Sequence, residues 1–363
     1  MPDFIPGLEL SELFYQEAVS PILASNFPAV RYSAALLGSG SEVLGFDTPR
    51  STDHHWGPRV QIFLSEDDHA GYAARMAEVL SRKLPYRFRG YSTNFGRPDE
   101  HGVQLLSDIE SGPVNHRVEI KTIRSFFEGY LGLNPDDKMQ VLDWLTIPEQ
   151  RLLTVTAGRV YHDGLGTLDQ VRKRFSYYPR DVWLHLLAMQ WAWIGQEEAF
   201  IGRAGEVGDE LGSQIIAAHL VRALMKLCFL MERQYAPYSK WFGTAFGRLS
   251  CAKRLSPVLQ NVLQAQSWRE RERQLSICYE LVAEMHNTLG ITRPLDTKVS
   301  PFYNRSHQVI HAERFAHEIR EAISDQKVRK MKIPIGSIDQ FVDCTDVTSN
   351  PQLFRRLRIM FEQ

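Results

Sequence analysis

The sequence predicts an α+β fold, with an N-terminal part that mixes strands and helices and an all-helical C-terminal part. Short apolar runs typical of strands alternate with helical segments up to about Gly158, and beyond it the strand pattern ends. A chain of 363 residues with 44% hydrophobic residues can also fill two packed cores. We therefore expect one α/β domain over residues 1–157 and a helical domain with a C-terminal tail over residues 158–363.

The N-terminal elements follow from apolar spacing and from capping residues. Apolar positions at helical spacing predict a helix over residues 7–24. Ser65, followed by three acidic residues, is a suitable N-cap for a helix that extends to Leu84. Strands are predicted over residues 34–37, 59–64, 86–93 and 115–123, and short helices over 125–131 and 137–145.

The C-terminal part shows helical periodicity throughout. Pro179 stands where proline suits the first turn of a helix. Helices are predicted over residues 168–175, 179–198, 208–235, 252–265, 268–289 and 307–325.

Charge and cysteine usage narrow the class of protein. The 42 basic and 43 acidic residues nearly balance, which argues against a general binder of nucleic acid or membrane surfaces. A local basic patch is still compatible with this balance, so a nucleic acid is not excluded as the acceptor. The 4 cysteines are far apart and lack CxxC spacing, as expected of reduced thiols in a cytoplasmic protein. The sequence begins without a signal-peptide pattern, and its most apolar run contains Arg222 and Lys226, so we expect no membrane partner.

A Gly-Ser loop follows the first predicted strand. Gly38, Ser39, Gly40 and Ser41 would let the backbone approach a phosphate closely and offer N–H and hydroxyl donors. The lysine-containing signature of a P-loop is absent from this stretch. The loop therefore indicates a phosphate site without specifying its class.

Acidic and imidazole groups precede the next strand. Asp53 and His55 stand just before predicted strand 59–64, which begins with Arg59. In a later strand, Glu119 shares one face with Arg117 and Lys121, because successive side chains of a strand alternate sides.

The spacing from Gly40-Ser41 to Asp53 resembles that of the nucleotidyltransferase superfamily, where a Gly-Ser turn is followed by Asp-x-Asp at the next strand. The whole chain, including the segments 177–183, 202–210 and 235–242, is similar to an uncharacterised bacterial family of unknown function placed within that superfamily. The resemblance implies a DNA polymerase beta-like fold. It also implies a helical C-terminal domain that closes the cleft, as in aminoglycoside (kanamycin) nucleotidyltransferases.

The resemblance further implies a reaction and a set of residues. The expected activity is transfer of a nucleoside monophosphate, AMP from ATP, to a hydroxyl of an unidentified small molecule, with a divalent metal, Mg²⁺ or Mn²⁺, orienting the triphosphate. The implied metal ligands are Asp53, His55 and Glu119; the nucleotide-binding residues are Gly38, Ser39, Gly40, Ser41, Arg59 and Lys240; and the candidate catalytic residues are Asp53, Glu119, Glu206 and Glu210.

Plainer explanations exist for the residues of the helical part. An acidic run around Glu206 and Glu210 commonly marks a solvated helix start. Lys240, between aromatic residues, is equally typical of a surface lysine that covers an aromatic core.

His55 departs from the superfamily pattern, since it stands where a second carboxylate is expected. Imidazole suits Mn²⁺ or Zn²⁺ better than Mg²⁺. Three explanations follow: a softer metal, a replacement acid from Glu42 or Asp47, or a degenerate protein that binds a nucleotide without turning it over. Asp53-His54-His55 also matches the motif of manganese phosphoesterases, although the acidic ligands expected on earlier strands are missing.

Overall fold

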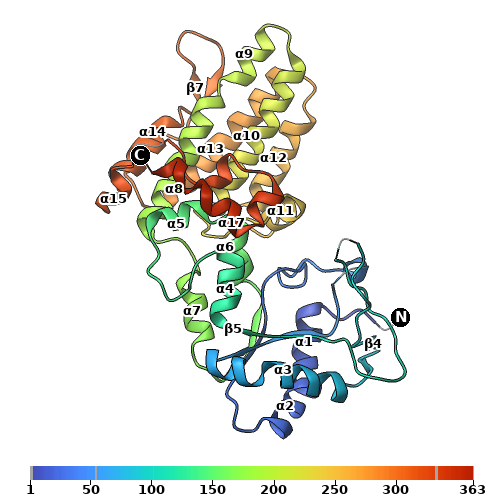
Figure 1. Ribbon diagram of the computed structural model, residues 1–363. Helices are drawn as coiled ribbons and strands as arrows, with labels where there is room; N and C mark the ends of the chain where they lie inside the picture. Colours follow the sequence, from blue (N-terminus) through green and yellow to red (C-terminus); the bar gives the residue numbers. More distant parts are fainter. Residues whose placement is uncertain (1–2, 54, 101, 332–333, 363) are drawn as a thin grey trace. The chain divides into compact units, whose positions relative to one another are not determined.

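The computed structural model describes residues 3–53, 55–100, 102–331 and 334–362, with Asp53 described by its backbone alone. The chain forms two compact units and passes between them at 138–139, 150–151 and 176–177. The first unit consists of Met1–Lys138 and Arg151–Ser176, and the second of Met139–Gln150 and Tyr177–Gln363. The first contains the mixed sheet and the second is mainly helical, so the predicted α+β class is confirmed (Figure 1).

The sheet of the first unit has 4 strands in the order β5-β2-β1-β6. Strand β1 is antiparallel to both its neighbours, whereas β2 and β5 are parallel. Strands β1, β2 and β5 lie where the sequence predicts strands, whereas β6 was not predicted. The strands are β1 (Ser33–Leu36), β2 (Arg59–Leu64), β5 (Arg117–Thr122) and β6 (Arg159–Asp163).

Strand β6 corrects the expectation that strands end at Gly158. It pairs with β1 in the register Ser33↔Asp163, at the edge of the sheet. Its pairing draws residues up to Ser176 into the first unit, so the compact units divide differently from the predicted boundary at residue 158. Residues 86–93 also differ from prediction, because they form a short hairpin of β3 (Arg87–Phe88) and β4 (Tyr91–Ser92) in place of one strand.

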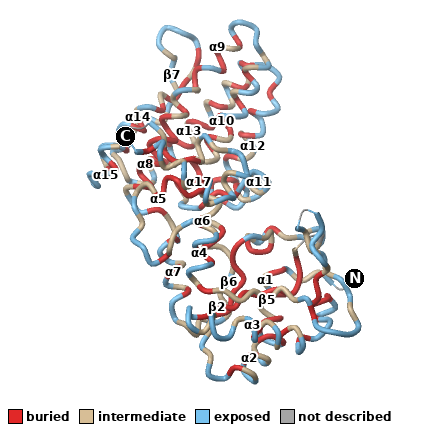
Figure 2. Tube along the Cα trace, viewed as in Figure 1, coloured by how far each residue is buried: buried red, intermediate tan, exposed pale blue. Residues whose placement is uncertain are grey.

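Helices cover one face of the sheet and form the core of the first unit. Val60, Ile62 and Leu64 of β2 are buried in this core (Figure 2). Ser65 caps the last of these helices as predicted, since its hydroxyl accepts a hydrogen bond from the Asp68 N–H at 3.1 Å. The covering elements are α1 (Gly7–Phe14), the π-helical η1 (Tyr15–Val19), α2 (Ser20–Asn26) and α3 (Glu66–Lys83).

Because successive side chains of β2 point to opposite faces of the sheet, Arg59, Gln61 and Phe63 lie on the face opposite to this core. There, Phe63 packs edge-on against Phe126 of α4 (Ile123–Leu131), with ring centroids 5.5 Å apart. Arg59 and Gln61 lie nearer the Gly-Ser loop, and their side chains donate hydrogen bonds to the backbone that follows β1. This face of the sheet therefore carries polar groups close to the Gly-Ser loop.

The second unit is built around two long apolar helices. Buried residues run along α8 (Arg180–Glu197) and α10 (Glu210–Met231), which pack against each other. The surrounding elements are α5 (Val141–Thr146), α6 (Glu149–Thr156, shared with the first unit), α9 (Phe200–Glu206), α11 (Ser239–Phe246), α12 (Ala252–Gln264), α13 (Trp268–Thr288), α14 (Glu313–Glu321), η3 (Ile338–Gln340), α16 (Thr345–Thr348), α17 (Pro351–Phe354) and η4 (Arg355–Phe361). The remaining elements are α7 (Leu168–Arg174) in the first unit, and β7 (Ser300–Pro301), β8 (Gln308–Val309) and α15 (Gln326–Arg329) in the second.

Helix α10 has the length and composition of a membrane span, the one such case among the described residues. More than half of its most apolar window, 56%, is buried inside the fold. That burial fits the core helix of a globular unit, because an apolar helix must cover its surface with protein when no lipid does.

Candidate functional site

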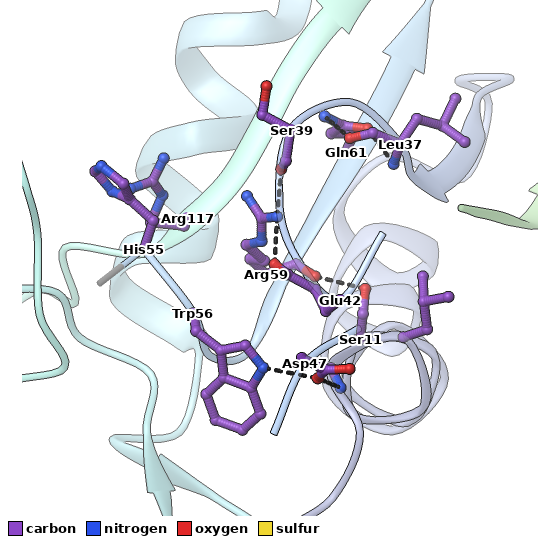
Figure 3. A network of polar contacts seen from close by, with 12 residues as sticks. Ser11, Leu37, Ser39, Glu42, Asp47, His55, Trp56, Arg59, Gln61 and Arg117 are labelled. Atoms are coloured by element: carbon purple, nitrogen blue, oxygen red, sulfur yellow. Dashed lines mark hydrogen bonds and ion pairs between the residues drawn. The ribbon is translucent and has the colours of Figure 1, made fainter. Parts of the chain in front are cut away.

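The Gly-Ser loop is fixed to the end of β1 by the neighbouring strand. The Gln61 side chain accepts a hydrogen bond from the Leu37 N–H at 3.0 Å and donates one to the Leu37 carbonyl at 3.1 Å. Arg59 donates to the Ser39 carbonyl at 2.8 Å. Two side chains of β2 thus bind the backbone of the loop, and Figure 3 shows these residues.

Glycine is required at two loop positions. Gly38 and Gly40 have φ angles of 93° and 144°, which side chains rarely adopt. A Cβ atom on Gly38 would collide with the Tyr130 side chain, and one on Gly40 would collide with Arg59 and Glu42. The backbone can follow this path only without side chains.

Two donors of the loop remain open. The Ser39 N–H donates to the Tyr130 hydroxyl at 3.1 Å. The N–H groups of Gly40 and Ser41 have no hydrogen-bond partner among the described residues. Adjacent open amides in a glycine-containing turn are a common anion-binding arrangement.

Arg59 braces this loop from a buried position. Its guanidinium forms an ion pair with Glu42, and both side chains are nearly inaccessible to solvent. The hydroxyl of Ser11 donates to the Arg59 carbonyl at 2.6 Å. Arg59, predicted to bind nucleotide, is therefore occupied by Glu42 and Ser39.

Neither proposed replacement acid is free of protein partners. Glu42 pairs with Arg59. Asp47 accepts hydrogen bonds from the Gly7 N–H at 2.7 Å and from the indole N–H of Trp56 at 3.1 Å. Both carboxylates hold the loop and the adjoining segment in place.

Asp53 ends the 3₁₀ turn η2 (Pro49–Asp53), and its side chain lies outside the described residues, as does all of His54. His55 has a left-handed backbone, with φ 53°, and its N–H donates to the Gln104 carbonyl at 2.9 Å. Its Nδ1 lies 2.6 Å from the Arg117 guanidinium. A guanidinium can only donate, so Nδ1 accepts, and its lone pair is not available to a metal in this arrangement.

A polar ladder on β5 lies beside β2 in register, with Glu119 opposite Gln61. Lys121 contacts the Glu119 carboxylate at 2.7 Å, and Arg117 lies 3.8 Å from it. Burial acts to raise the pKa of Glu119, but Lys121, Arg59 and Arg117 together outweigh it and lower the pKa. Glu119 is therefore ionised at neutral pH, between two cations.

A metal ion needs several donor side chains that are free to coordinate it. His55 and Glu119, two of the three predicted ligands, both face the Arg117 guanidinium. Among the described residues, no group of three or more His, Cys, Asp or Glu side chains could hold a metal ion. Both of these described side chains, one imidazole and one carboxylate, therefore already contact a cation, and the side chain of Asp53, the third predicted ligand, lies outside the described residues. Together with the open loop amides, the cations fit a phosphate-bearing anion better.

The predicted residues of the helical part lie in the second unit and have their own partners. Glu206 accepts a hydrogen bond from Arg305 at 2.9 Å. Glu210 forms an ion pair with the buried Arg271. Lys240 is exposed, with its ammonium 5.1 Å from the ring centroid of Trp241, as expected of a lysine that covers an aromatic side chain.

Sequence reasoning did not find a second group of charged residues. Glu149, Lys226 and Asp339 come together beside a cavity of the second unit. The available signal was Lys226 within a mostly apolar helix. Its acidic partners lie far away in the sequence, so no local pattern connects them.

Residues 144–242 match a family model described as a domain of unknown function (DUF4037). The match covers less than half of the chain. It bears out the expected similarity to an uncharacterised family over that segment. No curated protein and no solved structure matches the chain.

Proposed function

We propose that the chain is a nucleotidyltransferase-like protein, which transfers a nucleoside monophosphate, AMP from ATP, to a hydroxyl group of a small-molecule acceptor. One arrangement supports this proposal. The Gly-Ser loop and the Arg117-Glu119-Lys121 ladder belong to the two strands that flank β2, and Arg59 and Gln61 of β2 hold the loop. Backbone N–H groups that could bind a phosphate, and cations that could neutralise its charge, therefore occupy neighbouring positions on one sheet.

In the proposed step, the acceptor oxygen attacks the α-phosphorus and forms a new P–O bond. The bond from that phosphorus to the bridging oxygen of the β-phosphate breaks, pyrophosphate leaves, and the hydroxyl proton passes to a base. The Gly40 and Ser41 amides would bind phosphate oxygens, while Arg117 and Lys121 would neutralise their charge. The resemblance implies Mg²⁺ or Mn²⁺, but we assign no step to either because the described donors do not fit one.

Glu206 and Glu210 remain our candidates for the base. Each would first have to release its cation, since Arg305 holds Glu206 and Arg271 holds Glu210. Lys240, which is exposed, remains our candidate for the triphosphate.

The test is pyrophosphate release from ATP, with Mg²⁺ or Mn²⁺ present and a panel of hydroxylated acceptors. We expect release that depends on the acceptor and that Asp53→Asn abolishes. If pyrophosphate never forms and Asp53→Asn leaves ATP binding unchanged, the transferase proposal fails. Release of a nucleoside monophosphate from a phosphodiester with Mn²⁺ would indicate the phosphoesterase instead.

One observation favours a second candidate, a non-catalytic nucleotide-binding protein. The Arg117 guanidinium lies between His55 and Glu119, where the superfamily pattern expects acids around a metal. A fixed cation at that point can neutralise a phosphate but cannot activate it as a divalent metal does. Calorimetry would then detect ATP binding in EDTA with the same affinity as in Mn²⁺, and no turnover. ATP binding that requires the metal would exclude this candidate.

A further inference from the structure

The second unit contains a cavity of about 460 Å³, a volume typical of small-molecule sites. Its walls come from the start of α6, from α10, from α11 and the segment before it, from α12, and from η3 and the chain after it. The lining residues from Pro148 to Phe242 lie within the segment that matches the family model. All described lining residues belong to the second unit, so the cavity is separate from the Gly-Ser loop.

Apolar side chains form much of the cavity wall and continue onto the surface beside it. Leu263 of α12 lines the cavity and is itself exposed. On α10, the exposed residues Leu211 and Ile215 lie at helical spacing from the lining residue Ala218 and therefore share its face. Exposed apolar surface of this kind is covered when an apolar ligand binds. Further apolar lining residues are Val221, Met225, Phe242 and Val342.

Two of the charged lining residues neutralise each other. Arg222 donates two hydrogen bonds to the Asp343 carboxylate, of 2.7 and 2.6 Å. These hydrogen bonds lower the pKa of Asp343, so its carboxylate is ionised at neutral pH. Each member of this partly exposed pair therefore has its counter-charge within the protein.

The buried charges of the wall also sum to zero. The Lys226 ammonium donates to the backbone carbonyl of Asp339. Burial lowers the pKa of Lys226 and raises that of Asp339, and the pair has no net charge whether the proton lies on the amine or on the carboxylate. Burial also raises the pKa of Glu149 to about 8, so its carboxyl group holds a proton at neutral pH, and the Ala236 N–H donates to it.

This balance determines which ligands the cavity can accept. An ion of either sign would lose its water without gaining a counter-charge, whereas a neutral molecule loses little. Two lining hydroxyl groups, those of Ser239 and Thr345, have no hydrogen-bond partner among the described residues. They can bind a hydroxyl group of a ligand, because a hydroxyl both donates and accepts.

From this charge balance and the apolar wall, we infer that the cavity binds a neutral organic molecule, an apolar body with a hydroxyl group as its polar part. The apolar body lies against Val221, Met225 and Phe242, and the hydroxyl group meets those of Ser239 and Thr345. This inference does not depend on the proposed nucleotide chemistry.

The test uses three indole compounds of similar shape and different charge: the neutral alcohol tryptophol, the cation tryptamine and the anion indole-3-propionate. Binding to the full chain is measured at pH 7 by calorimetry and by saturation-transfer NMR, without nucleotide. We expect tryptophol to bind at least about tenfold more tightly than either ion, since neither ion finds a counter-charge in the cavity. No binding of tryptophol, or equal binding of either ion, would overturn the inference.

Two variants disturb the charge balance in opposite directions. Asp343→Asn leaves Arg222 without its counter-ion, so the affinity for indole-3-propionate should rise by about threefold or more, as expected of a partly exposed ion pair. Arg222→Gln leaves Asp343 instead and should raise the affinity for tryptamine by a similar factor. Glu321→Gln breaks the exposed ion pair with Arg329, away from the cavity, and as the matched control should change neither.

A third variant locates the site. Ala218→Phe places a ring in the cavity from an exposed position, so the folded variant should bind tryptophol at least about tenfold more weakly. Unchanged tryptophol affinity in folded Ala218→Phe would place the ligand elsewhere and overturn the inference. Unchanged affinities for the two ions in both Asp343→Asn and Arg222→Gln would contradict the role of the charge balance. If one of these two variants does not fold, the other still decides.

Discussion

The Nδ1 atom of His55 accepts a hydrogen bond from the Arg117 guanidinium at 2.6 Å. This pair joins the residue that departs from the superfamily pattern to a cation on the neighbouring strand. His55→Asp would place a carboxylate beside Arg117 and could restore the second acid. We expect nucleotide binding in Mn²⁺ to strengthen by several-fold over binding in EDTA, measured by calorimetry. His69→Asp, on α3, is the control; loss of all ATP binding in His55→Asp would contradict the degenerate-site explanation.

Lys121 offers a separate test of the phosphate site. Lys121→Gln removes one cation and leaves Glu119 with Arg117 alone. We expect ATP affinity to fall by about tenfold, because a charge-assisted hydrogen bond contributes about 1.5–3 kcal/mol. Arg124→Gln, an exposed neighbour on α4, should leave the affinity unchanged. Equal losses in the two variants would indicate general electrostatic attraction instead of a defined site.

The Gly-Ser loop can be tested by comparing two glycines with similar backbones. Gly38→Ala adds both backbone strain and a collision with Tyr130, and should destabilise the protein by about 1–3 kcal/mol in urea unfolding. Gly112→Ala shares the positive φ, 88°, but faces open space. Only Gly38→Ala should also lose ATP binding. Normal binding in a folded Gly38→Ala would remove the loop from the site.

The raised pKa of Glu149 leads us to expect that the stability of the protein depends on pH. Its pKa rises from 4.5 to about 8 on folding, so between these values the folded protein holds a proton that the unfolded chain has lost. Stability should therefore fall as pH rises from about 5 to 8, by up to about 1.4 kcal/mol per pH unit. Asp339, with its pKa also raised, acts in the same direction, and Lys226, with its pKa lowered, opposes it at higher pH.

Glu149→Gln removes this proton exchange and should flatten the fall, as measured by urea unfolding at several pH values. The buried tyrosines nearest this carboxylate, Tyr177, Tyr178 and Tyr235, have their pKa values raised by burial and stay neutral over this range. Glu321→Gln is the control. A parallel slope in Glu149→Gln and the wild type would show that another group carries the dependence.

Glu210 allows a structural role to be separated from a catalytic one. Glu210→Ala leaves the buried Arg271 without its carboxylate, which should cost about 1–3 kcal/mol in unfolding free energy. If the pairing is its whole role, the folded variant should retain any transferase activity found. Stability equal to wild type with complete loss of activity would instead identify Glu210 as the base.

Local patterns predicted much of the fold. Strand β2 was predicted with its observed bounds, because its apolar and polar residues lie between clear turn residues, and the Ser65 cap marked the start of α3. Strand β6 was missed because its half-exposed residues form a strand by pairing with β1, far away in the sequence. The same reason applies to the cavity, where Glu149 meets Asp339 across 190 positions.

The sequence predicted the loop and ladder residues but not their partners. Gly38 and Glu119 were identified from residue type and spacing. That Arg59 would be held by Glu42, and His55 by Arg117, depends on which side chains neighbouring strands bring together. Residue type and spacing do not show which side chains pair, since any acidic residue of the region could have paired with Arg59.

The pairing of β6 with β1 affects what would happen if the matched segment were moved into another protein. The segment that matches the family model, residues 144–242, carries β6 but not β1, its partner. Transplanted alone into another chain, that segment would present an unpaired strand edge, and such an edge promotes aggregation. In this protein that edge is covered by β1, which lies outside the matched segment.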